Sequence, residues 1–578
     1  MRQVFKPAQQ LVNQSPRHIR LLVTSATHQH SLIAFGILFC LFANACSSRP
    51  RSNAHLTHPI NKGKPVTFTD KKPTVRYQEP EYLSYDELVE LSKNPEPTPA
   101  VAQKLEKFWR SPVISNEAWF SGKRPQHQST THLGPLLRVA SWNIEKSLTI
   151  NPAAAAIRSQ SAYVDLIHSD KAPEGSSKRE IMLRQRERLA TADIIFLQEM
   201  DIGVTRSNKI DAARTLAKTL GMNYAYAPQS LEVDPVQLGL EPREGIPAVQ
   251  PDRYKGVFGS AILSRYPILK VEAFQLKTQP YNWHTDESRR TDFVEDSRRL
   301  GSAIVFENEI TRELKIGGRN YFRVDIAVPQ VPGGVVTLIN NHLEIKTRPK
   351  GRKAQMDEIL GYIKDIPHPV IMAGDHNSAP DDLSSTSLLR VIWRQIDSPA
   401  ALLRTTASLS DILAGTVVPL YRERGILNAM KNFQNPLAFD IPILFPNNVR
   451  GLFESVEDHR FADGSTFDFR GDRDRSINGS RAILANSNEK HFRGHSTTFS
   501  VRRPIGPFGR YRLDWFFVRS GHLKKPRSKD APYQFAPHFG ETLAEFNDGL
   551  TNRLSDHQPI VIDLPLEEPG QAVVPERE

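Results

Sequence analysis

The sequence predicts an α/β (α+β) protein built on mixed β-sheets. Short apolar runs typical of buried strands alternate with stretches in which apolar residues recur at helical spacing. In several places, however, two strand-like runs follow each other with no helix between them. Because neighbouring parallel strands need a crossover connection, usually a helix, this succession favours sheets that contain both parallel and antiparallel strands.

The expected elements follow one another from residue 136 onward. Strand-like runs occupy residues 136–142, 193–197, 260–264, 335–339, 369–373, 512–518 and 559–564. Helices are predicted at 181–190, at 211–220, where Gly221 ends the helix, and at 351–363. The last of these helices has Met356, Ile359, Leu360 and Ile363 on one face, which should pack against a sheet.

The first 45 residues have the composition of an export signal. They contain four basic residues and no acidic one, and they include an apolar run at 31–43. This run is too short to span a bilayer comfortably and is typical of a signal-peptide core. Ala43 and Ala45 then supply the small residues of a cleavage site. These features predict a signal peptide over residues 1–45.

Cys46 directly follows the predicted cleavage site. The only other cysteine, Cys40, lies inside the signal peptide, so the processed chain cannot form an internal disulfide. The segment around Cys46 resembles a bacterial lipoprotein box, in which the cysteine after the cut is acylated. We therefore expect an exported periplasmic or cell-envelope protein, anchored in the membrane through a lipid on Cys46. Plain secretion and an uncleaved N-terminal anchor are the alternatives.

The rest of the chain divides into an extension, a principal domain and a tail. Residues 46–134 are expected to be a tether and N-terminal extension with a helix at about 100–109, and residues 567–578 a C-terminal tail. The principal domain covers 135–566 and contains an insertion at about 383–497, which is long enough to be a subdomain or a functional loop. The formal net charge of +11 suits an anionic partner such as nucleic acid or phospholipid head groups, but a basic surface that serves only solubility would explain it equally well.

Six short polar motifs stand at the ends of the apolar runs. In chain order they are Trp142-Asn143-Ile144-Glu145, Gln198-Glu199, Asn340-Asn341-His342-Leu343-Glu344, Gly374-Asp375-His376-Asn377, Leu513-Asp514-Trp515 and Ser555-Asp556-His557. Strand ends at one edge of a sheet are where α/β enzymes build their sites. The set offers carboxylate and amide oxygens without cysteine, which suits a hard divalent cation such as Mg²⁺. The neighbouring histidines can orient a water molecule or carry a proton near neutral pH.

Each motif has an ordinary structural explanation when it is taken alone. An asparagine after a strand, such as Asn143, usually forms a turn or a cap. Gln198-Glu199 could end a strand in solvent, and His342 alone would more often be a partly buried histidine with its hydrogen bonds satisfied. All six motifs in order, each beside a strand-like run, are poorly explained by chance.

The ordered motifs resemble those of the endonuclease/exonuclease/phosphatase superfamily, which includes deoxyribonucleases, inositol-polyphosphate 5-phosphatases and neutral sphingomyelinases. The resemblance runs from about residue 137 to 564. Two further pieces are similar to the family: Gly259-Ser260-Ala261-Ile262-Leu263-Ser264-Arg265-Tyr266-Pro267-Ile268, and Thr498-Phe499 ahead of Arg512-Leu513-Asp514. The resemblance implies a four-layered sandwich of two mixed β-sheets flanked by helices.

The same resemblance implies a role for each matching position. Glu199 would be the principal Mg²⁺ ligand, with Asn143 beside it contacting metal or phosphate. Asp375 and Asn377 would orient water and phosphate, and Asp514 would support the set from behind. Asp556 and His557 would form a pair in which the carboxylate holds the imidazole. His342 would lie on the phosphate or leaving-group side.

Other polar residues near the motifs are open to two interpretations. Glu145 departs from the aspartate found in some nucleases, and we do not count it as a ligand. Arg265 is a candidate phosphate contact, although a buried structural arginine is an equal alternative. The basic residues Lys346, Arg348, Lys350, Arg352 and Lys353 could form either a solvated loop and helix start or a strip that contacts backbone phosphates.

The predicted function is therefore metal-dependent hydrolysis of a phosphoester, of the phosphodiesterase or nuclease kind, with Mg²⁺ or alternatively Mn²⁺. A lipid or small-molecule phosphatase or a sphingomyelinase-like enzyme is the first alternative, and a catalytically silent binding module of the same fold is the second. The expected partners are a phosphoester substrate, nucleic acid or phospholipid, and the membrane through the lipid anchor. We expect the chain to be a monomer.

Overall fold

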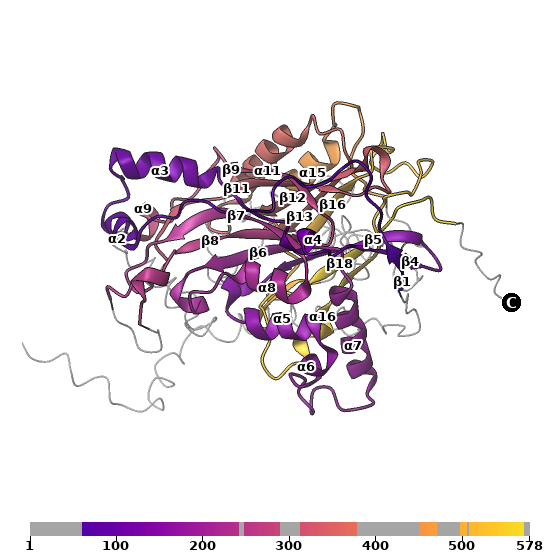
Figure 1. Cartoon of the computed structure of the whole chain (residues 1–578), viewed down its shortest axis with the longest axis horizontal. Coiled ribbons are helices and arrows are strands. Elements are labelled where there is room, and N and C mark those ends of the chain that lie inside the picture. The colour runs from indigo at the N-terminus through magenta and orange to yellow at the C-terminus, as the bar shows by residue number, and fades with distance from the viewer. Residues whose placement is uncertain are drawn as a thin grey trace, which may run out of the picture. The chain divides into compact units, whose positions relative to one another are not determined.

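Two β-sheets lie face to face between two layers of helices (Figure 1). The computed structural model describes residues 60–241, 248–288, 313–378, 450–470, 475, 497–505 and 508–570. All of them belong to one compact unit. The predicted signal peptide, Cys46, most of the insertion and the end of the C-terminal tail lie outside the described residues.

The larger sheet has 11 strands within the described ranges. Its order is β1 (Asn61–Pro65), β4 (Gln126–Thr130), β5 (Gly134–Asn143), β6 (Ile194–Ile202), β8 (Val257–Ser264), β7 (Asn223–Glu232), β3 (Val113–Ser115) and β2 (Tyr77–Gln78). Strand β10 (Lys315–Gly317) pairs with β7, β18 (Ile560–Pro565) with β5, and β17 (His538–Thr542) with β18. Strands β5 and β6 are parallel, whereas β6 and β8 are antiparallel. The sheet is therefore mixed, as the sequence predicts.

The smaller sheet supplies the opposite wall of the sandwich. Its order is β16 (Asp514–Arg519), β13 (Val370–Asp375), β12 (Val335–His342), β11 (Asn320–Ala327) and β9 (Ile268–Gln275). Strands β12 and β13 are parallel and are joined through helix α11 (Pro349–Ile363), as expected of a crossover connection. A separate hairpin is formed by β14 (Phe499–Ile505) and β15 (Phe508–Tyr511).

Helices cover the outer faces of both sheets. Helices α5 (Ile150–Arg158), α6 (Gln160–Val164), α7 (Ser177–Ala190), α8 (Ala212–Leu220) and α16 (Ala544–Asp548) lie on the larger sheet, and α11 and α15 (Arg450–Asp458) on the smaller one. Further short helices are α2 (Tyr85–Lys93), α3 (Pro99–Trp109), α4 (Glu117–Phe120) and α9 (Thr285–Ser288), together with the 3-10 turns Glu145–Ser147, Thr205–Ser207, Pro251–Arg253 and Pro332–Gly334. The predicted four-layered sandwich is confirmed.

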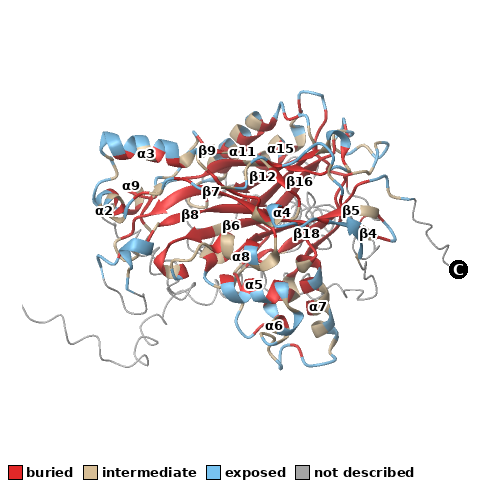
Figure 2. Cartoon of the chain, in the orientation of Figure 1, coloured by how far each residue is buried: buried red, intermediate tan, exposed pale blue. Residues whose placement is uncertain are grey.

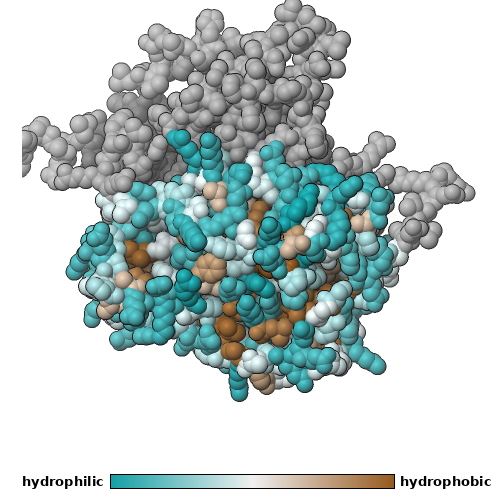
Figure 3. Space-filling view, turned by 90° about the horizontal axis from the view of Figure 1, so that it is seen from above, coloured by the Kyte–Doolittle hydropathy of each residue, from teal (hydrophilic) through white to brown (hydrophobic). Residues whose placement is uncertain are grey.

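The apolar core between the sheets follows from the alternation of side chains along each strand. Val139 and Phe196 of the larger sheet face Val324, Leu338 and their neighbours in the smaller sheet, and all are buried. Buried residues are accordingly concentrated along both sheets, while the helices expose their outer sides (Figure 2). In the coloured part of the view from above, hydrophilic side chains predominate, and the hydrophobic ones gather mainly towards its lower right (Figure 3). No helix among the described residues is long and apolar enough to cross a membrane.

The structure corrects two of the predicted boundaries. From residue 60 onward, the predicted tether and extension are part of the domain, because β1 and β4 join one side of the larger sheet and β2 and β3 the other. Within the predicted insertion at 383–497, residues 450–470 belong to the domain as well. Phe453, Phe461 and Phe467 from this stretch are buried on the outer face of the smaller sheet.

Candidate active site

The strands carry the polar motifs to one edge of the sandwich. In the larger sheet Asn143, the last residue of β5, lies opposite Gln198 in the parallel strand β6. In the smaller sheet Asp375 lies between His342 and Asp514 on the neighbouring strands. Because parallel strands end at the same edge, residues that are far apart in the sequence meet there, as the sequence predicts.

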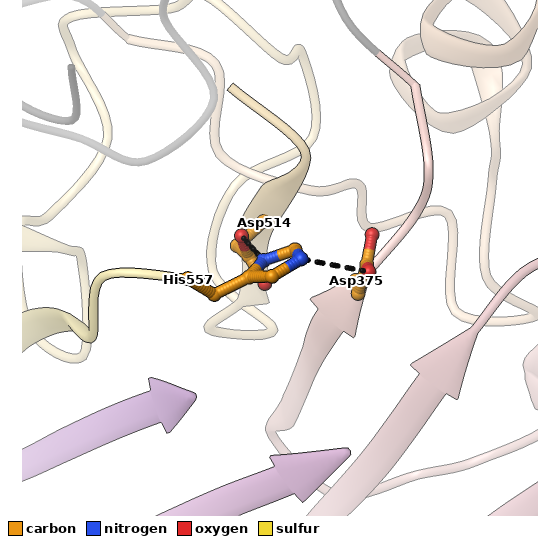
Figure 4. Close-up of side chains that lie close together, drawn as sticks. All are labelled: Asp375, Asp514 and His557. Carbon is orange, nitrogen blue, oxygen red and sulfur yellow. Dashed lines mark hydrogen bonds and ion pairs between the residues drawn. The ribbon is translucent and has the colours of Figure 1, made fainter. Parts of the chain in front are cut away.

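Three buried side chains form a line at the centre of this edge (Figure 4). The Nδ1 atom of His557 is hydrogen-bonded to Oδ2 of Asp514 at 2.8 Å. On the other side of the ring, Nε2 of His557 lies 3.7 Å from Oδ2 of Asp375. A carboxylate on Nδ1 fixes the orientation of the imidazole and leaves Nε2 to face the reacting groups.

Burial and charge act against each other on the pKa values of His557 and Asp375, and a different one prevails at each residue. Burial alone would lower the pKa of His557, but the charge of Asp514 and its hydrogen bond outweigh that effect and raise the pKa well above its ordinary value. Burial raises the pKa of Asp375 to about 7, against the opposing charge of His557. At neutral pH the line therefore holds an imidazolium beside a carboxyl group that can exchange a proton.

Asn143 and Asn377 fix the Asp375 carboxylate from two directions. Asn143 donates from Nδ2 to Oδ2 of Asp375 at 3.1 Å, and the backbone N–H of Asn377 donates to Oδ1 at 2.7 Å. The Asn377 side chain in turn donates to the carbonyl of Leu343 at 2.9 Å. Both asparagines are buried and both belong to the group that the sequence predicts.

Glu199 approaches the same group from the larger sheet. It stands at a bulge in β6 with a φ of 60°, and its side chain is 21% exposed. The Nε2 atom of His342 lies 3.9 Å from Oε1 of Glu199 and 3.9 Å from Oδ2 of Asp375. Burial, followed by the charge of Arg319, lowers the pKa of His342 well below its ordinary value. His342 is thus a neutral imidazole between two carboxylates.

The predicted pairing of Asp556 with His557 is wrong in its geometry. The carboxylate that binds the imidazole is that of Asp514, whereas Asp556 is anchored here through its backbone. Its N–H donates to Oε2 of Glu145 at 2.9 Å, and its carbonyl accepts from the N–H of Ser500 at 3.1 Å. The charge of Asp556 still helps to raise the pKa of His557, after the larger effects of Asp514 and Asp375.

The structure does not bring Arg265 to this group. Because β8 runs antiparallel to β6, Ser264 pairs with Ile194 at the opposite end of β6 from Glu199. Arg265 follows there and donates to the carbonyls of Ala190 and Ala192, both at 3.0 Å. It binds the end of helix α7, so the predicted contact with substrate is replaced by a structural role.

The basic residues after His342 do not form one surface strip. Arg352 is fully buried and donates to Ser378 and to backbone carbonyls, and Lys353 pairs with Asp357 one helical turn away. Lys346 pairs with Glu287 and lies over the ring of Trp283. These contacts favour the structural interpretation for at least three of the five cations.

Three residues to which the sequence assigned no role also hold the site together. Asn340 donates to the carbonyls of Leu197 and Ala261 and so joins the two sheets. The Thr498 hydroxyl accepts from the N–H of Asp514 at 3.2 Å. Ser147 contacts the backbone of Glu199. Asn340 lies within one of the six motifs and Thr498 within a segment that resembles the family, whereas Ser147 has no local pattern that distinguishes it.

The residues present fit a hard divalent cation. Glu199 and Asn143 offer oxygen donors, and the site contains no thiol. Asp375, Asp514 and His557 bring one potential ligand atom each within 4.8 Å of one another. The Oδ1 atom of Asp514 is buried and has no hydrogen-bond partner among the described residues. A buried carboxylate oxygen without a partner is costly, and a cation or a bound water would satisfy it.

Comparison with known proteins gives the chain its family. Similar solved structures include an endonuclease/exonuclease/phosphatase from Beutenbergia cavernae DSM 12333, with 17% identity over 76% of this chain and 73% of that one and a TM-score of 0.34. An AP endonuclease from Archaeoglobus fulgidus has 12% identity over 74% and 98% of the two chains and a TM-score of 0.32. A 3'-5' exonuclease from Neisseria meningitidis has 13% identity over 74% of this chain and 99% of that one and a TM-score of 0.31.

At these TM-scores the similarity to solved structures does not by itself assign a family. A search of curated protein sequences finds no match. The sequence match to a family is decisive. Residues 140–557 match the Endonuclease/Exonuclease/phosphatase family, a range that includes every one of the six motifs. The chain therefore belongs to the Endonuclease/Exonuclease/phosphatase family and is a hydrolase of phosphoester bonds.

Proposed function

We propose that the protein is a Mg²⁺-dependent phosphodiesterase of the nuclease kind, with Mn²⁺ as an alternative ion. The observation that carries this proposal is the buried line of Asp514, His557 and Asp375, with Glu199 and His342 beside it. A phosphodiester resists hydrolysis because the nucleophile must attack an anion. This line provides both a cationic group and a group that can accept a proton, side by side.

Each residue of the line would have a different role in the hydrolysis. Protonated His557 would hold a phosphate oxygen and neutralise the charge that develops on it. Asp375, with a pKa of about 7, is suited to accept a proton from the attacking water near neutral pH. Asp514 would keep the imidazolium oriented, and neutral His342 would contact the phosphate or the leaving group.

Glu199, together with Asn143, would hold the metal ion. The side-chain oxygen Oδ1 of Asn143 accepts from the N–H of Glu145 at 3.1 Å and keeps a second lone pair for a ligand. When bound, the ion would supply Lewis-acid stabilisation of the phosphate charge. The side chains of this chain orient water and substrate around it.

The substrate class is proposed from charge. The net charge is +11 for the whole chain and +7 once the predicted signal peptide, with its four basic residues, is removed. This positive charge favours a polyanion such as DNA or RNA over a small phosphomonoester. A phospholipid or sphingomyelin remains the alternative substrate, and it is an outcome of the same test.

The test is a substrate panel measured with the purified full chain in Mg²⁺, in Mn²⁺ and in a chelator. The panel contains plasmid DNA, abasic DNA, RNA, sphingomyelin, phosphatidylinositol phosphates and bis-p-nitrophenyl phosphate. We expect metal-dependent cleavage of a nucleic acid. Cleavage of the lipids alone would show that the substrate is a phospholipid or sphingomyelin and not a nucleic acid. Activity that survives chelation would contradict the metal requirement. Inertness towards every substrate would favour a catalytically silent binding module.

We also propose that the protein is exported and attached to the membrane by a lipid on Cys46. The proposal is supported by the signal-like residues 1–45 and by the position of the cysteine directly after the cleavage pattern. Replacing Cys46 with serine should release the protein from the membrane fraction of the producing cell. Unchanged membrane association of that variant would refute acylation.

A further inference from the structure

Glu199 stands where the regular pairing of its strand breaks down. Strand β6 pairs with β5 only as far as Gln198, and its register with β8 shifts between Leu197 and Met200. Glu199 occupies this bulge with a φ of 60°, a left-handed conformation that non-glycine residues seldom adopt. The bulge aims the carboxylate at the site, but it also removes backbone hydrogen bonds that a regular ladder would make.

The hydroxyl of Ser147 spans this gap. It donates to the carbonyl of Glu199 at 3.1 Å and accepts from the N–H of Asp201 at 3.1 Å. Ser147 is 1% exposed, so water does not compete for these bonds. One side chain thereby binds the backbone on both sides of Met200 and replaces the missing ladder contacts.

The turn that carries Ser147 is itself strained. Glu145, Lys146 and Ser147 have φ values of 45°, 52° and 58°. Left-handed backbone is unfavourable for non-glycine residues, so the surrounding contacts must hold the turn in this shape.

Those contacts lead to the candidate metal ligands. The N–H of Lys146 donates to Oε2 of Glu199 at 3.1 Å, and the N–H of Glu145 donates to Oδ1 of Asn143 at 3.1 Å. The ammonium group of Lys146 is paired with Glu313. The turn therefore binds the side chains of Glu199 and Asn143 as well as the backbone of Glu199.

We propose that Ser147 is a positioning residue for Glu199, and that the turn Glu145–Ser147 presets the pair Asn143 and Glu199 for a divalent cation. The proposal rests on the proposed function, in which Glu199 holds the metal. Ser147 does not itself touch the cation; it holds the bulge that presents the carboxylate. Removing a residue that holds a metal ligand in place, without touching the metal itself, typically weakens metal binding by about 10–100-fold.

Two variants distinguish the effect of losing the Ser147 hydroxyl from the effect of backbone strain at this position. Ser147→Ala removes both hydrogen bonds and keeps the left-handed residue. Ser147→Gly removes the same bonds but relieves the positive φ, so it should fold at least as readily as the alanine variant. If the hydroxyl is what matters, both variants should bind metal more weakly than the wild type.

Ser264→Ala is the matched control. Ser264 is also fully buried in the larger sheet, and its hydroxyl accepts one backbone bond, from the N–H of Tyr266 at 3.0 Å. It lies at the opposite end of β6 from Glu199. A general effect of losing a buried serine hydroxyl should appear in this variant too.

The measurement is Mn²⁺ binding to the metal-free full chain, from the free-ion signal in electron paramagnetic resonance, with circular dichroism to confirm folding. We expect binding about 10–100-fold weaker in both Ser147 variants and unchanged in Ser264→Ala. If the wild type binds Mn²⁺ and the Ser147 variants bind it equally well, the positioning role is refuted. If the wild type itself does not bind Mn²⁺, the metal in the proposed function fails instead.

Discussion

The Nδ1 atom of His557 meets Oδ2 of Asp514 at 2.8 Å, although 43 residues separate them in the sequence. Asp514 begins β16 and His557 precedes β18, so the hydrogen bond joins the smaller sheet to the larger one. The bond fixes which ring nitrogen faces Asp375 and keeps the imidazole protonated. The proposed acid–base chemistry depends on this one contact.

Replacing Asp514 with asparagine should reduce kcat by about 10²–10⁴-fold, the usual contribution of a positioned acid–base group. The substitution removes the charge that raises the pKa of His557, while burial, which lowers that pKa, remains. The imidazolium should then deprotonate at lower pH, so the alkaline limb of the pH–rate profile should move to lower pH. The measurement is kcat from pH 5 to 10, and an unmoved alkaline limb would contradict the assigned role.

His376 should make the fold sensitive to acid without taking part in catalysis. It is fully buried, is stacked on Phe517 at a centroid distance of 5.4 Å, and burial lowers its pKa to about 3. A histidine with a lowered pKa contributes its full stability above pH 6.5 and loses it progressively as the pH falls towards 3.

The variant His376→Phe should remove that loss. Relative to the wild type, its free energy of unfolding should gain about 2 kcal/mol between pH 7.5 and pH 5, since each pH unit below 6.5 is worth about 1.4 kcal/mol. Urea unfolding at the two pH values measures the difference. An equal difference at both pH values would mean that His376 is protonated as easily in the fold as in the unfolded chain.

Arg265 should matter for stability and not for turnover. Its guanidinium donates to the carbonyls of Ala190 and Ala192 at the end of α7. Arg265→Ala should lower the free energy of unfolding by roughly 2 kcal/mol, the usual size for hydrogen bonds from a charged group. The folded variant should keep kcat/KM within about twofold of the wild type. A large rise in KM with unchanged stability would restore the role in substrate binding.

Two adjacent asparagines should respond in opposite ways. Asn340 donates to Leu197 and Ala261 and accepts from Gln198 at 2.8 Å, so Asn340→Leu leaves buried groups without partners and should cost about 3 kcal/mol or more. The side-chain atoms of Asn341 are buried and have no hydrogen-bond partner among the described residues. Asn341→Leu should therefore be neutral or stabilising. Chemical unfolding of both variants checks the contrast, and equal losses would contradict it.

Local sequence patterns located most of the principal elements. The apolar run at 136–142 lies inside β5, and the helix predicted at 211–220 is α8, which begins at Ala212 and ends before Gly221. Continuous apolar runs and glycine stops are local signals, so they can be interpreted without the tertiary structure. Strand β7, with Pro228 and Gln229 in its middle, lacks such a run, and only its place between β8 and β3 makes it a strand.

The sequence predicted which residues form the site better than it predicted which of their side chains contact one another. The order of the motifs placed Glu199, Asp375 and His557 together, because strand ends share one edge of a sheet. The partner of His557 was misassigned to Asp556, since adjacency in sequence does not determine which carboxylate the fold brings to Nδ1 of the ring. Ser147 was missed because its role depends on a bulge in another segment, which no local pattern announces.

The most direct test of the central claim compares the wild type with Asp375→Asn and His557→Gln on bis-p-nitrophenyl phosphate in Mg²⁺. Both substitutions preserve the size of the side chain and remove its ability to exchange a proton at neutral pH, and circular dichroism verifies the fold. The account predicts metal-dependent turnover by the wild type and a loss of at least about 10²-fold in each folded variant. Turnover by either variant at the wild-type rate would contradict it.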